Sequence, residues 1–405
     1  MRTFAFLTFG CKVNQYESQA LRERMAGRGL VEVPPQEGAD LYVVNTCAVT
    51  EVAAAEGRRV VRRLARRFPS AEFTVTGCAA DEGFRDSPCV RRVVPHSLKA
   101  RLGLDPGEPC ASIFDLAISR FDGHTRAFLK VEDGCDLDCS FCIVPKVRGP
   151  AASRPLPDAL EEARRLAGAG YREIVIAGVH LGAYGKDLAG RSLLPDLVEG
   201  MLGIPGLARV RLSSIEANEI SDPLLDLMAR EPRFCPHLHV PLQSGDDAVL
   251  RAMRRRYGVR QFLAACGRAA ERVPAPGLTT DVIVGFPGET EEQFRNTLDV
   301  CRRAGFSRIH IFPYSRRRGT DAARLPDLPG RVKKERLHRL ERAAEELADA
   351  AARRFLGREV EVLVEEDGGG YTERYLRARV PGAPNTIVRA RVERVDHGEL
   401  QGVPA

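Results

Sequence analysis

Val131-Glu-Asp-Gly-Cys-Asp-Leu-Asp-Cys-Ser-Phe-Cys-Ile-Val-Pro-Lys-Val-Arg148 is the stretch on which the interpretation of the whole chain depends. Its three cysteines, Cys135, Cys139 and Cys142, follow the spacing C-x3-C-x2-C, and Phe141 directly precedes the third. Three thiolates in one short loop can bind three irons of a cubane cluster and leave the fourth iron open, whereas an electron-transfer cluster is closed by a fourth cysteine. A structural zinc site also needs four ligands, usually as two spaced pairs. The spacing therefore predicts an iron–sulfur cluster with one open position.

This spacing, with an aromatic residue before the third cysteine, resembles the cluster motif of the radical S-adenosylmethionine superfamily. The resemblance implies that the amino and carboxylate groups of S-adenosylmethionine chelate the open iron. It also implies that an electron from the reduced cluster cleaves the sulfonium and produces a 5′-deoxyadenosyl radical.

The composition is that of a globular protein, with 405 residues, 44% hydrophobic and 29% charged. No apolar run approaches the length of a membrane span, about 18 residues, and the apolar stretch Phe4–Phe9 is too short for a signal-peptide core. We therefore expect a cytoplasmic protein with no membrane partner. Eleven cysteines in such a compartment favour metal or redox chemistry over disulfides. The net charge of +6 is a mild indication of a nucleic-acid partner.

Residues 1–115 are predicted to form an N-terminal α/β domain, because strand-like and helix-like stretches alternate there. The predicted strands are 3–9, 41–45 and 73–76, and the predicted helices are 14–28 and 50–68. Cys11, Cys47 and Cys78 each come just after one of these strands. Because the carboxyl ends of parallel strands lie along one edge, where ligands bind, we expect the three cysteines to converge there.

The predicted helix 50–68 carries a continuous basic face. Its arginines, with no interleaved acid, are Arg58, Arg59, Arg62, Arg63, Arg66 and Arg67. Such a face is often only solvated, but an uninterrupted row of arginines also suits a phosphate backbone. We predict RNA contact here, with Arg58, Arg62 and Arg66 as the candidate residues.

Residues 121–356 contain a second alternation of strands and helices. The predicted strands are 128–131, 173–177, 210–214, 237–242, 280–284 and 308–312, and the long helix 333–355 follows them. Six such units predict an open partial (β/α)6 barrel related to the eight-unit form. The cysteine loop directly follows the first strand, at the carboxyl face where such barrels carry their active sites.

The other predicted strands of this barrel also end in polar or glycine-rich turns, which let a backbone approach a ligand closely. The residues that we expect to bind the cofactor at these ends are Gly178, Glu216, Gln243, Ser244 and Asp281. His237 and His239 alternate along one strand, and we expect them to be packed or hydrogen-bonded and not to ligate a metal.

Five cysteines fall outside the two groups described above. Cys89 and Cys110 have no regular relation to a strand end, and we expect them to be structural. Cys235, Cys266 and Cys301 have apolar neighbours and are expected in the core.

From residue 357 onward, short strands alternate with glycine and proline turns, at 360–364, 376–380 and 387–395. This pattern predicts a small β-barrel over residues 357–405. Residues 358–405 hold seven Arg against nine Asp and Glu and are slightly acidic. We therefore expect the arginine-rich helix and Arg316–Arg318 to carry more of the RNA contact than this barrel does.

With these parts placed, nearly the whole chain resembles the methylthiotransferase family of the radical S-adenosylmethionine superfamily, whose members end in a barrel of the TRAM type. Gly178-Val-His-Leu-Gly182 and His239-Val-Pro-Leu-Gln-Ser-Gly245 are also similar to motifs of that family. The resemblance implies two [4Fe-4S] clusters. One would be held by Cys135, Cys139 and Cys142 and bind S-adenosylmethionine. The second would be held by Cys11, Cys47 and Cys78.

Gly10-Cys-Lys-Val-Asn-Gln-Tyr-Glu17 is similar to the branch that adds a methylthio group to C2 of N6-threonylcarbamoyladenosine next to the anticodon of tRNA. The N6-isopentenyladenosine branch more often has Gln-Met-Asn after this cysteine, and a third branch modifies an aspartate of a ribosomal protein. The alternative from another class is a non-catalytic iron–sulfur protein that binds RNA. The implied partners are the tRNA anticodon loop, S-adenosylmethionine and an electron donor such as flavodoxin or ferredoxin.

The threonylcarbamoyl group carries a carboxylate, so its pocket should contain a cation or a cluster of amide donors. The candidate cations include Lys12, Lys146 and Arg148, which the sequence does not rank.

Overall fold

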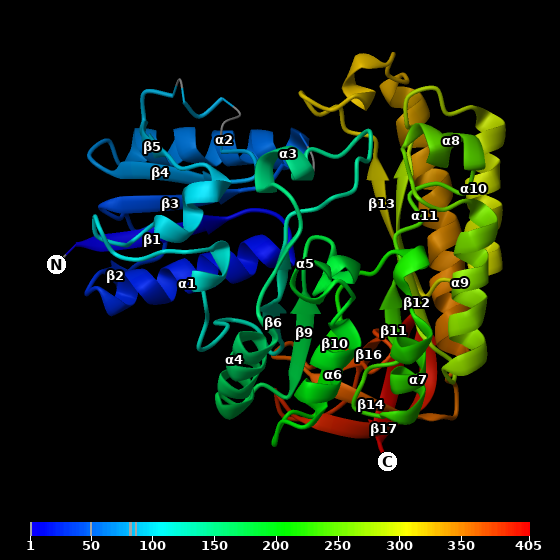
Figure 1. The fold of residues 1–405 in the computed structure, drawn as a ribbon. Helices are drawn as coiled ribbons and strands as arrows, with labels where there is room; N and C mark the ends of the chain where they lie inside the picture. Colours follow the sequence, from blue (N-terminus) through cyan, green and yellow to red (C-terminus); the bar gives the residue numbers. More distant parts are fainter. Residues whose placement is uncertain (1, 49–50, 81–82, 86) are drawn as a thin grey trace.

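The computed structural model describes residues 2–48, 51–80, 83–85 and 87–405 of the chain. It has three parts: an N-terminal sheet with helices on both faces, an open partial barrel, and a small closed β-barrel at the C-terminus (Figure 1). This is the α/β fold class that the sequence predicts.

The N-terminal sheet has five parallel strands in the order β2-β1-β3-β4-β5. Their bounds are β1 Thr3–Thr8, β2 Val31–Glu32, β3 Leu41–Thr46, β4 Glu72–Gly77 and β5 Val90–Val93. Helices α1 (Lys12–Gly27) and α2 (Glu51–Arg67) cover opposite faces of the sheet (Figure 1). The sequence predicts both helices and the three central strands. It misses the two edge strands because they are short and largely exposed, and so show no apolar alternation.

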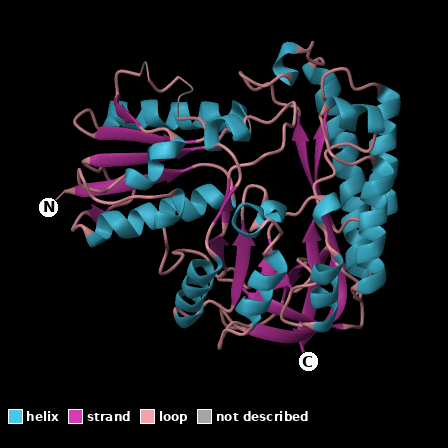
Figure 2. Ribbon diagram, in the orientation of Figure 1, coloured by secondary structure: helices cyan, strands magenta, loops and turns pink. Residues whose placement is uncertain are grey.

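The partial barrel contains six parallel strands, as predicted, arranged as two three-stranded sheets, β10-β9-β6 and β11-β12-β13 (Figure 2). Their bounds are β6 Ala127–Lys130, β9 Glu173–Ala177, β10 Arg209–Leu212, β11 His237–His239, β12 Gly277–Val284 and β13 Arg308–Pro313. A parallel bridge between Val210 and Phe234 connects the two sheets at their junction. The short strands β7 (Glu132–Asp133) and β8 (Ala152–Ser153) form a separate antiparallel pair beside β6.

Most helices of this part cover the outside of the barrel, whereas the short helix α3 lies against the N-terminal part of the chain (Figure 1). Their bounds are α3 Val144–Arg148, α4 Leu156–Gly168, α5 Lys186–Ala189, α6 Leu194–Leu202, α7 Asp222–Arg230, α8 Asp247–Ala252, α9 Val259–Arg272, α10 Glu291–Ala304 and α11 Gly330–Arg353. The start of α10 shows why the local sequence predicts where such a helix begins. Thr290 Oγ1 accepts a hydrogen bond from the Gln293 amide at 3.2 Å, and the Thr290 amide donates to Gln293 Oε1 at 2.8 Å. These two bonds form a capping box, which the sequence predicts.

The C-terminal barrel closes through five strands in the order β14-β15-β16-β18-β17. Their bounds are β14 Glu359–Val364, β15 Gly369–Thr372, β16 Arg377–Arg379, β17 Ile387–Asp396 and β18 Glu399–Pro404. The sequence predicts only three strands, because the glycines of β15 are typical of a turn. In the structure a Cβ at Gly370 would lie 2.1 Å from the Leu363 carbonyl oxygen, so this tight pairing requires glycine.

One apolar core joins the N-terminal sheet to the partial barrel. Phe4, Phe6 and Tyr16 belong to the same buried cluster as Phe128 and Leu129 of β6. The other face of the N-terminal sheet has its own cluster beneath α2, and the C-terminal barrel has a third. The first two parts of the molecule therefore pack as one unit at the α1 side of the sheet.

Buried arginines attach the C-terminal barrel to the partial barrel. Arg209, which is 2% exposed, donates to the Glu361 carbonyl oxygen at 2.7 Å. Arg211, which is 1% exposed, donates to the carbonyl oxygens of Thr372 and Glu373, both at 3.0 Å. The carbonyls of Thr372 and Glu373 lie at the turn between β15 and β16, and that of Glu361 lies in β14, so both elements satisfy guanidinium groups that burial would otherwise leave unpaired.

The same turn covers the amino-terminal ends of the barrel strands. The Tyr375 ring stacks on the Tyr371 ring, with centroids 4.6 Å apart, and lies 4.8 Å from the ring of His237, the first residue of β11. A Cβ at Gly277, the first residue of β12, would lie 2.0 Å from the Arg374 carbonyl oxygen. The interior of the partial barrel is thus closed at this end.

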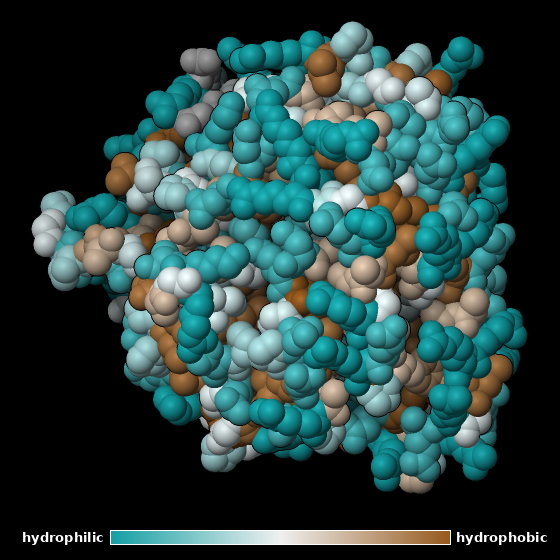
Figure 3. All heavy atoms as spheres, turned by 45° about the vertical axis from the view of Figure 1, so that its right-hand side comes forward, coloured by the Kyte–Doolittle hydropathy of each residue, from teal (hydrophilic) through white to brown (hydrophobic). Residues whose placement is uncertain are grey.

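No helix among the described residues is long and apolar enough to cross a membrane. The face drawn in Figure 3 is mostly hydrophilic, with apolar residues interspersed.

Candidate active site with two cysteine triads

The first cysteine group, Cys135, Cys139 and Cys142, is called the loop triad here and lies in the segment between β7 and α3. Gly134 begins this segment with φ +84°, and a Cβ there would lie 1.9 Å from the Pro150 carbonyl oxygen, so only glycine fits. The Cys135 amide donates to the Gly149 carbonyl oxygen at 3.1 Å. These contacts hold the loop beside the carboxyl end of β6.

The loop triad offers soft donors in a partly buried hollow. Burial raises the pKa of Cys135 to about 12 and that of Cys142 to about 11, so the thiolates need a nearby positive charge. A bound iron would supply that charge, because binding to a metal ion deprotonates a thiol. Arg255 adds a donor to the cluster side, with Nη1 3.3 Å from Cys139 Sγ. The residues present therefore fit a three-thiolate cluster site.

The second group, Cys11, Cys47 and Cys78, is called the strand triad, because its members follow β1, β3 and β4. These strands are neighbours in the parallel sheet, so the three cysteines stand at adjacent strand ends. A Cβ at Gly10 would lie 2.4 Å from Cys47 Sγ, which shows how closely the first two turns approach each other. The Cys78 amide donates to the Thr46 carbonyl oxygen at 3.0 Å, which ties the third turn to the second.

A single guanidinium connects the two triads. Arg148 donates through Nε to Cys78 Sγ at 3.1 Å and through Nη2 to Asn14 Oδ1 at 2.7 Å. Its Nη1 donates to Asp133 Oδ1 at 2.7 Å, two residues before Cys135. Burial alone would lower the pKa of Arg148, but Asp133, Cys78 and nearby acids hold it well above its usual value. Arg148 is therefore a fixed cation between the triads.

Glu17 is the buried acid at the centre of this network. Its carboxylate accepts from Arg148 at 2.9 Å, from Lys130 at 2.6 Å, and from Lys99. Burial alone would raise the pKa of Glu17, but Arg148, Lys130 and Lys99 hold it well below its usual range. This network is not among the features predicted from the sequence. The available signal was Lys130 itself, a charge within the apolar strand β6.

A cavity of about 170 Å³ lies between the triads. Its wall includes Ala48, which follows Cys47 of the strand triad, together with Phe141 and Cys142 of the loop. Gln243 and Asp281, both expected to bind the cofactor, also line it. The cavity therefore contacts the loop triad directly, reaches the residue next to Cys47 of the strand triad, and lies at the carboxyl face of the barrel.

The remaining residues expected to bind the cofactor are not part of the wall of this cavity. Glu216 lies beside Cys139 and accepts a hydrogen bond from Arg255. Gly178 directly follows β9, and a Cβ there would lie 2.8 Å from Glu132 Oε2.

Ser244 is fully buried and lies next to helix α10. Its hydroxyl oxygen is 3.4 Å from Thr297 Oγ1. Its neighbour Gln243 adopts φ +63°, so the chain turns sharply between the cavity wall and α10.

The arginines of α2 form an exposed face, as the sequence predicts for a charged helix surface. Arg62 and Arg66 are exposed, and each donates through Nε to the carbonyl oxygen one turn earlier. Arg58 is half-buried and pairs with Glu51 at 2.6 Å.

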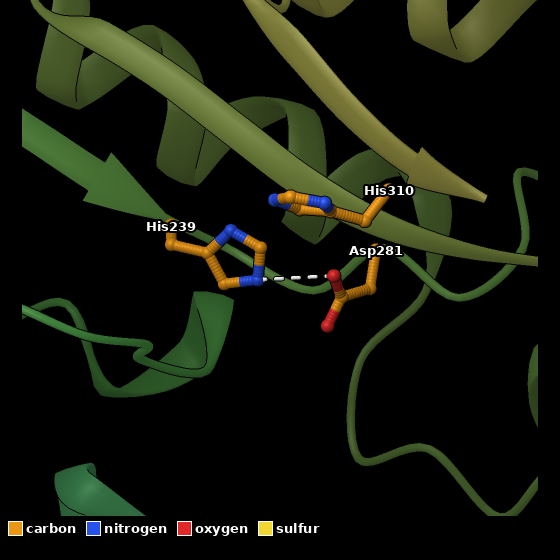
Figure 4. A group of neighbouring side chains, drawn as sticks. All are labelled: His239, Asp281 and His310. Carbon is orange, nitrogen blue, oxygen red and sulfur yellow. Dashed lines mark ion pairs between the residues drawn. The ribbon is translucent and has the colours of Figure 1, made fainter. Parts of the chain in front are cut away.

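Three polar side chains point toward one another inside the barrel (Figure 4). His239, Asp281 and His310 come from the adjacent strands β11, β12 and β13, and His239 Nε2 lies 3.3 Å from Asp281 Oδ1. Burial lowers the pKa of His310 to about 4, so this ring is neutral near pH 7. His237 and His239 both lie within hydrogen-bond distance of Thr279 Oγ1, at 3.0 and 2.9 Å, as expected for hydrogen-bonded histidines.

The fold and the loop triad define a radical S-adenosylmethionine protein. The family model "Radical SAM superfamily" matches residues 129–301, and the model "Uncharacterized protein family UPF0004" matches residues 3–87. Among solved structures, the radical S-adenosylmethionine methyltransferase TsrM from Kitasatospora setae aligns with a TM-score of 0.58 and 15% identity, over 80% of this chain and 77% of that one. This likeness supports the fold alone.

Relatives of known name cover almost the whole chain. The threonylcarbamoyladenosine tRNA methylthiotransferase MtaB of Bacillus subtilis is 35% identical over 96% of this chain and 92% of its own length. The MtaB of Thermotoga maritima is 38% identical over 94% and 92%. A tRNA-2-methylthio-N(6)-dimethylallyladenosine synthase of Cereibacter sphaeroides is 38% identical over 89% and 87%. The chain belongs to the radical S-adenosylmethionine tRNA methylthiotransferase family.

Proposed function

We propose that this tRNA methylthiotransferase acts on N6-threonylcarbamoyladenosine next to the anticodon and adds the methylthio group at C2. The observation that carries the proposal is the cavity between the two triads. Its wall includes Cys142 of the loop triad and the residue after Cys47 of the strand triad. A base in this cavity is adjacent both to a site that can generate a radical and to a site that can hold sulfur.

The loop triad holds the [4Fe-4S] cluster that membership of the superfamily implies. With S-adenosylmethionine bound, this group supplies the radical chemistry that an unreactive C2–H bond requires. Gln243 and Asp281 line the cavity where the cofactor would extend, Glu216 lies beside Cys139 of the loop triad, and Gly178 follows strand β9. We assign these four residues, with the buried Ser244, to cofactor binding.

The strand triad holds a second [4Fe-4S] cluster in this proposal and carries the sulfur to be transferred. The fit rests on three thiols at neighbouring strand ends. The chain's own contribution is orientation, because Arg148 holds Cys78 by a hydrogen bond to sulfur and Asn14 braces the turn before Cys11. Asn14 Nδ2 also donates to the Thr46 carbonyl oxygen at 2.8 Å, next to Cys47.

The RNA partner is the anticodon loop, whose unpaired base can be splayed out of its stack and enter a pocket. The arginines of α2, with Arg58, Arg62 and Arg66 as candidates, bind phosphates of the same RNA. A reduced flavodoxin or ferredoxin supplies the electron.

The choice of substrate branch rests on Gly10–Glu17 and is tested by offering both modified RNAs. Anticodon stem-loops carrying threonylcarbamoyladenosine or isopentenyladenosine, and the ribosomal protein, are incubated with holoenzyme, S-adenosylmethionine and dithionite. Mass spectrometry should find methylthio product only on the threonylcarbamoyl RNA. Product only on the isopentenyl RNA, or only on the ribosomal protein, would reassign the branch.

A further inference from the structure

Lys12 is a cation whose side chain enters the partial barrel from another part of the chain. It is the first residue of α1 and directly follows Cys11 of the strand triad. Its ammonium lies 5.9 Å from the centroid of the Phe128 ring on β6. Its charge also acts on His237 of β11 and His310 of β13. These residues come from both sheets of the barrel, so the ammonium lies in the space between the sheets.

The structure separates the three candidate cations for the threonylcarbamoyl carboxylate. Arg148 is committed to Asp133, Asn14, Glu17 and Cys78. Lys146 donates to a backbone carbonyl, that of Gly319.

Lys12 differs from both, because it forms no hydrogen bond or ion pair with any residue that the structure describes. A half-buried ammonium without such a partner is able to accept an anionic ligand without breaking a hydrogen bond or ion pair within the protein.

The charges around Lys12 favour an anion. Arg126 and Arg211 both act on it as like charges, and Asp281 and the adjoining Cys11 act on it with opposite sign. Arg126 is paired with Glu365 at 3.0 Å and Arg211 with Glu173 at 2.6 Å. The surrounding cations are therefore fixed in place, and the ammonium is the group left to receive a ligand.

We infer that Lys12 binds the carboxylate of the threonylcarbamoyl group inside the barrel and so selects this substrate over the isopentenyl one. The inference rests on the proposed function. Asp281 lines the cavity and is also one of the charged groups that act on Lys12. A base with C2 between the triads can extend its N6 substituent toward the ammonium.

The selection follows from desolvation. A carboxylate replaces the water that the ammonium loses when the substrate fills the barrel interior, through a charge-assisted hydrogen bond. An isopentenyl group displaces the same water and offers no acceptor, which leaves a buried charge unpaired. Sites built for a polar partner reject analogues that lack it for this reason.

The test compares an acid with its neutral ester. Stem-loops carrying threonylcarbamoyladenosine or its methyl ester are offered to the wild type, to Lys12→Gln and to Lys12→Arg, with Lys146→Gln as a matched control. The wild type should prefer the acid by about 10- to 100-fold in kcat/KM, as expected for a hydrogen bond between charged groups. Lys12→Gln should abolish this preference, mainly through KM. Lys12→Arg should restore most of it, and Lys146→Gln should keep it.

A binding measurement accompanies the kinetics, because it needs no turnover. Anaerobic fluorescence anisotropy with the same two stem-loops should show the acid preference in the wild type and its loss in Lys12→Gln. Equal affinities of the wild type for acid and ester overturn the inference, as does an unchanged preference in Lys12→Gln. If the wild type makes methylthio product on the isopentenyl RNA and none on the threonylcarbamoyl RNA, the proposed function itself is wrong.

Discussion

Each triad consists of three cysteine thiols, but the fold brings the thiols of the two triads together in different ways. The loop triad lies within one segment, Cys135 to Cys142, and is positioned by local features such as the turn at Gly134. The strand triad runs from Cys11 to Cys78 and exists only once β1, β3 and β4 have paired. A motif in sequence can therefore identify the first, whereas the second depends on the topology of a sheet.

The sharpest way to separate the triads is to remove each one. Replacing Cys135, Cys139 and Cys142 by Ala should eliminate S-adenosylmethionine cleavage and about half of the iron, because the open iron site is lost. Replacing Cys11, Cys47 and Cys78 should leave cleavage to 5′-deoxyadenosine but abolish methylthiolation. Iron assay, chromatography of 5′-deoxyadenosine and nucleoside analysis provide the three readouts.

The control for these variants is Cys266→Ala, which removes a buried thiol from the core and should retain both activities. Methylthiolation by the variant without the strand triad would show that this triad carries no transferred sulfur.

A second prediction tests the turn that places Cys78 in the strand triad. Gly77 ends β4 with φ +101°, and a Cβ there would lie 2.3 Å from the Thr46 carbonyl oxygen. Gly77→Ala should therefore displace Cys78, lower the iron content toward half and stop methylthiolation while S-adenosylmethionine is still cleaved. Gly267→Ala in α9, where a Cβ meets nothing within 4 Å, should instead be neutral or stabilise by about 0.5–1 kcal/mol. Full iron content in Gly77→Ala would mean that the turn can relax.

A third prediction concerns the buried charges that lie between the triads. Glu17→Gln should destabilise the fold by about 3–5 kcal/mol, because Lys99, Lys130 and Arg148 would lose their shared counter-charge. The pKa of Glu17 lies well below its usual range, so its contribution is complete above the unfolded-state pKa of about 4.3 and is lost as pH falls through the folded value.

Denaturant unfolding from neutral pH downward checks this. The wild type should lose stability on acidification, and Glu17→Gln should lose less. Glu161→Gln, in a surface pair with Arg165, is the matched control and should change stability by less than about 0.5 kcal/mol. Equal effects of the two variants would contradict the assigned role of Glu17.

The smallest expected effect is on RNA affinity. Arg62→Glu with Arg66→Glu should weaken tRNA binding and reduce the slope of log affinity against log salt by about 0.7–0.9 per lost phosphate contact. Arg302→Glu with Arg303→Glu on α10 changes the net charge equally and should have less effect. Equal effects of both pairs would indicate that net charge, and not the α2 face, attracts the RNA. Cleavage of S-adenosylmethionine without RNA should not change in either.

The sequence predicts those features that depend on near neighbours. The loop triad, the capping box at Thr290 and the alternation of strands and helices all follow from spacing over a few residues. The position of the strand triad can be predicted only because the carboxyl ends of parallel strands lie along one edge of the sheet.

Pairings between distant residues could not be predicted in this way. The contacts of Arg148 with Cys78 and Asn14 join segments more than sixty residues apart, and no local pattern encodes them. Strand β15 was missed for a related reason, because its glycines are weak strand formers alone and are required only by the close approach of Leu363.

The attachment of the C-terminal barrel has a consequence for modularity. Arg209 and Arg211 donate to carbonyl oxygens that belong to residues 361–373, so a chain ending before that point would remove these acceptors from two guanidinium groups at the amino-terminal end of the partial barrel. The C-terminal barrel therefore cannot be exchanged for another domain without affecting the partial barrel. Its β15–β16 turn must vary together with the catalytic domain, whereas the strand β17, whose outward side chains are exposed, is able to diverge independently.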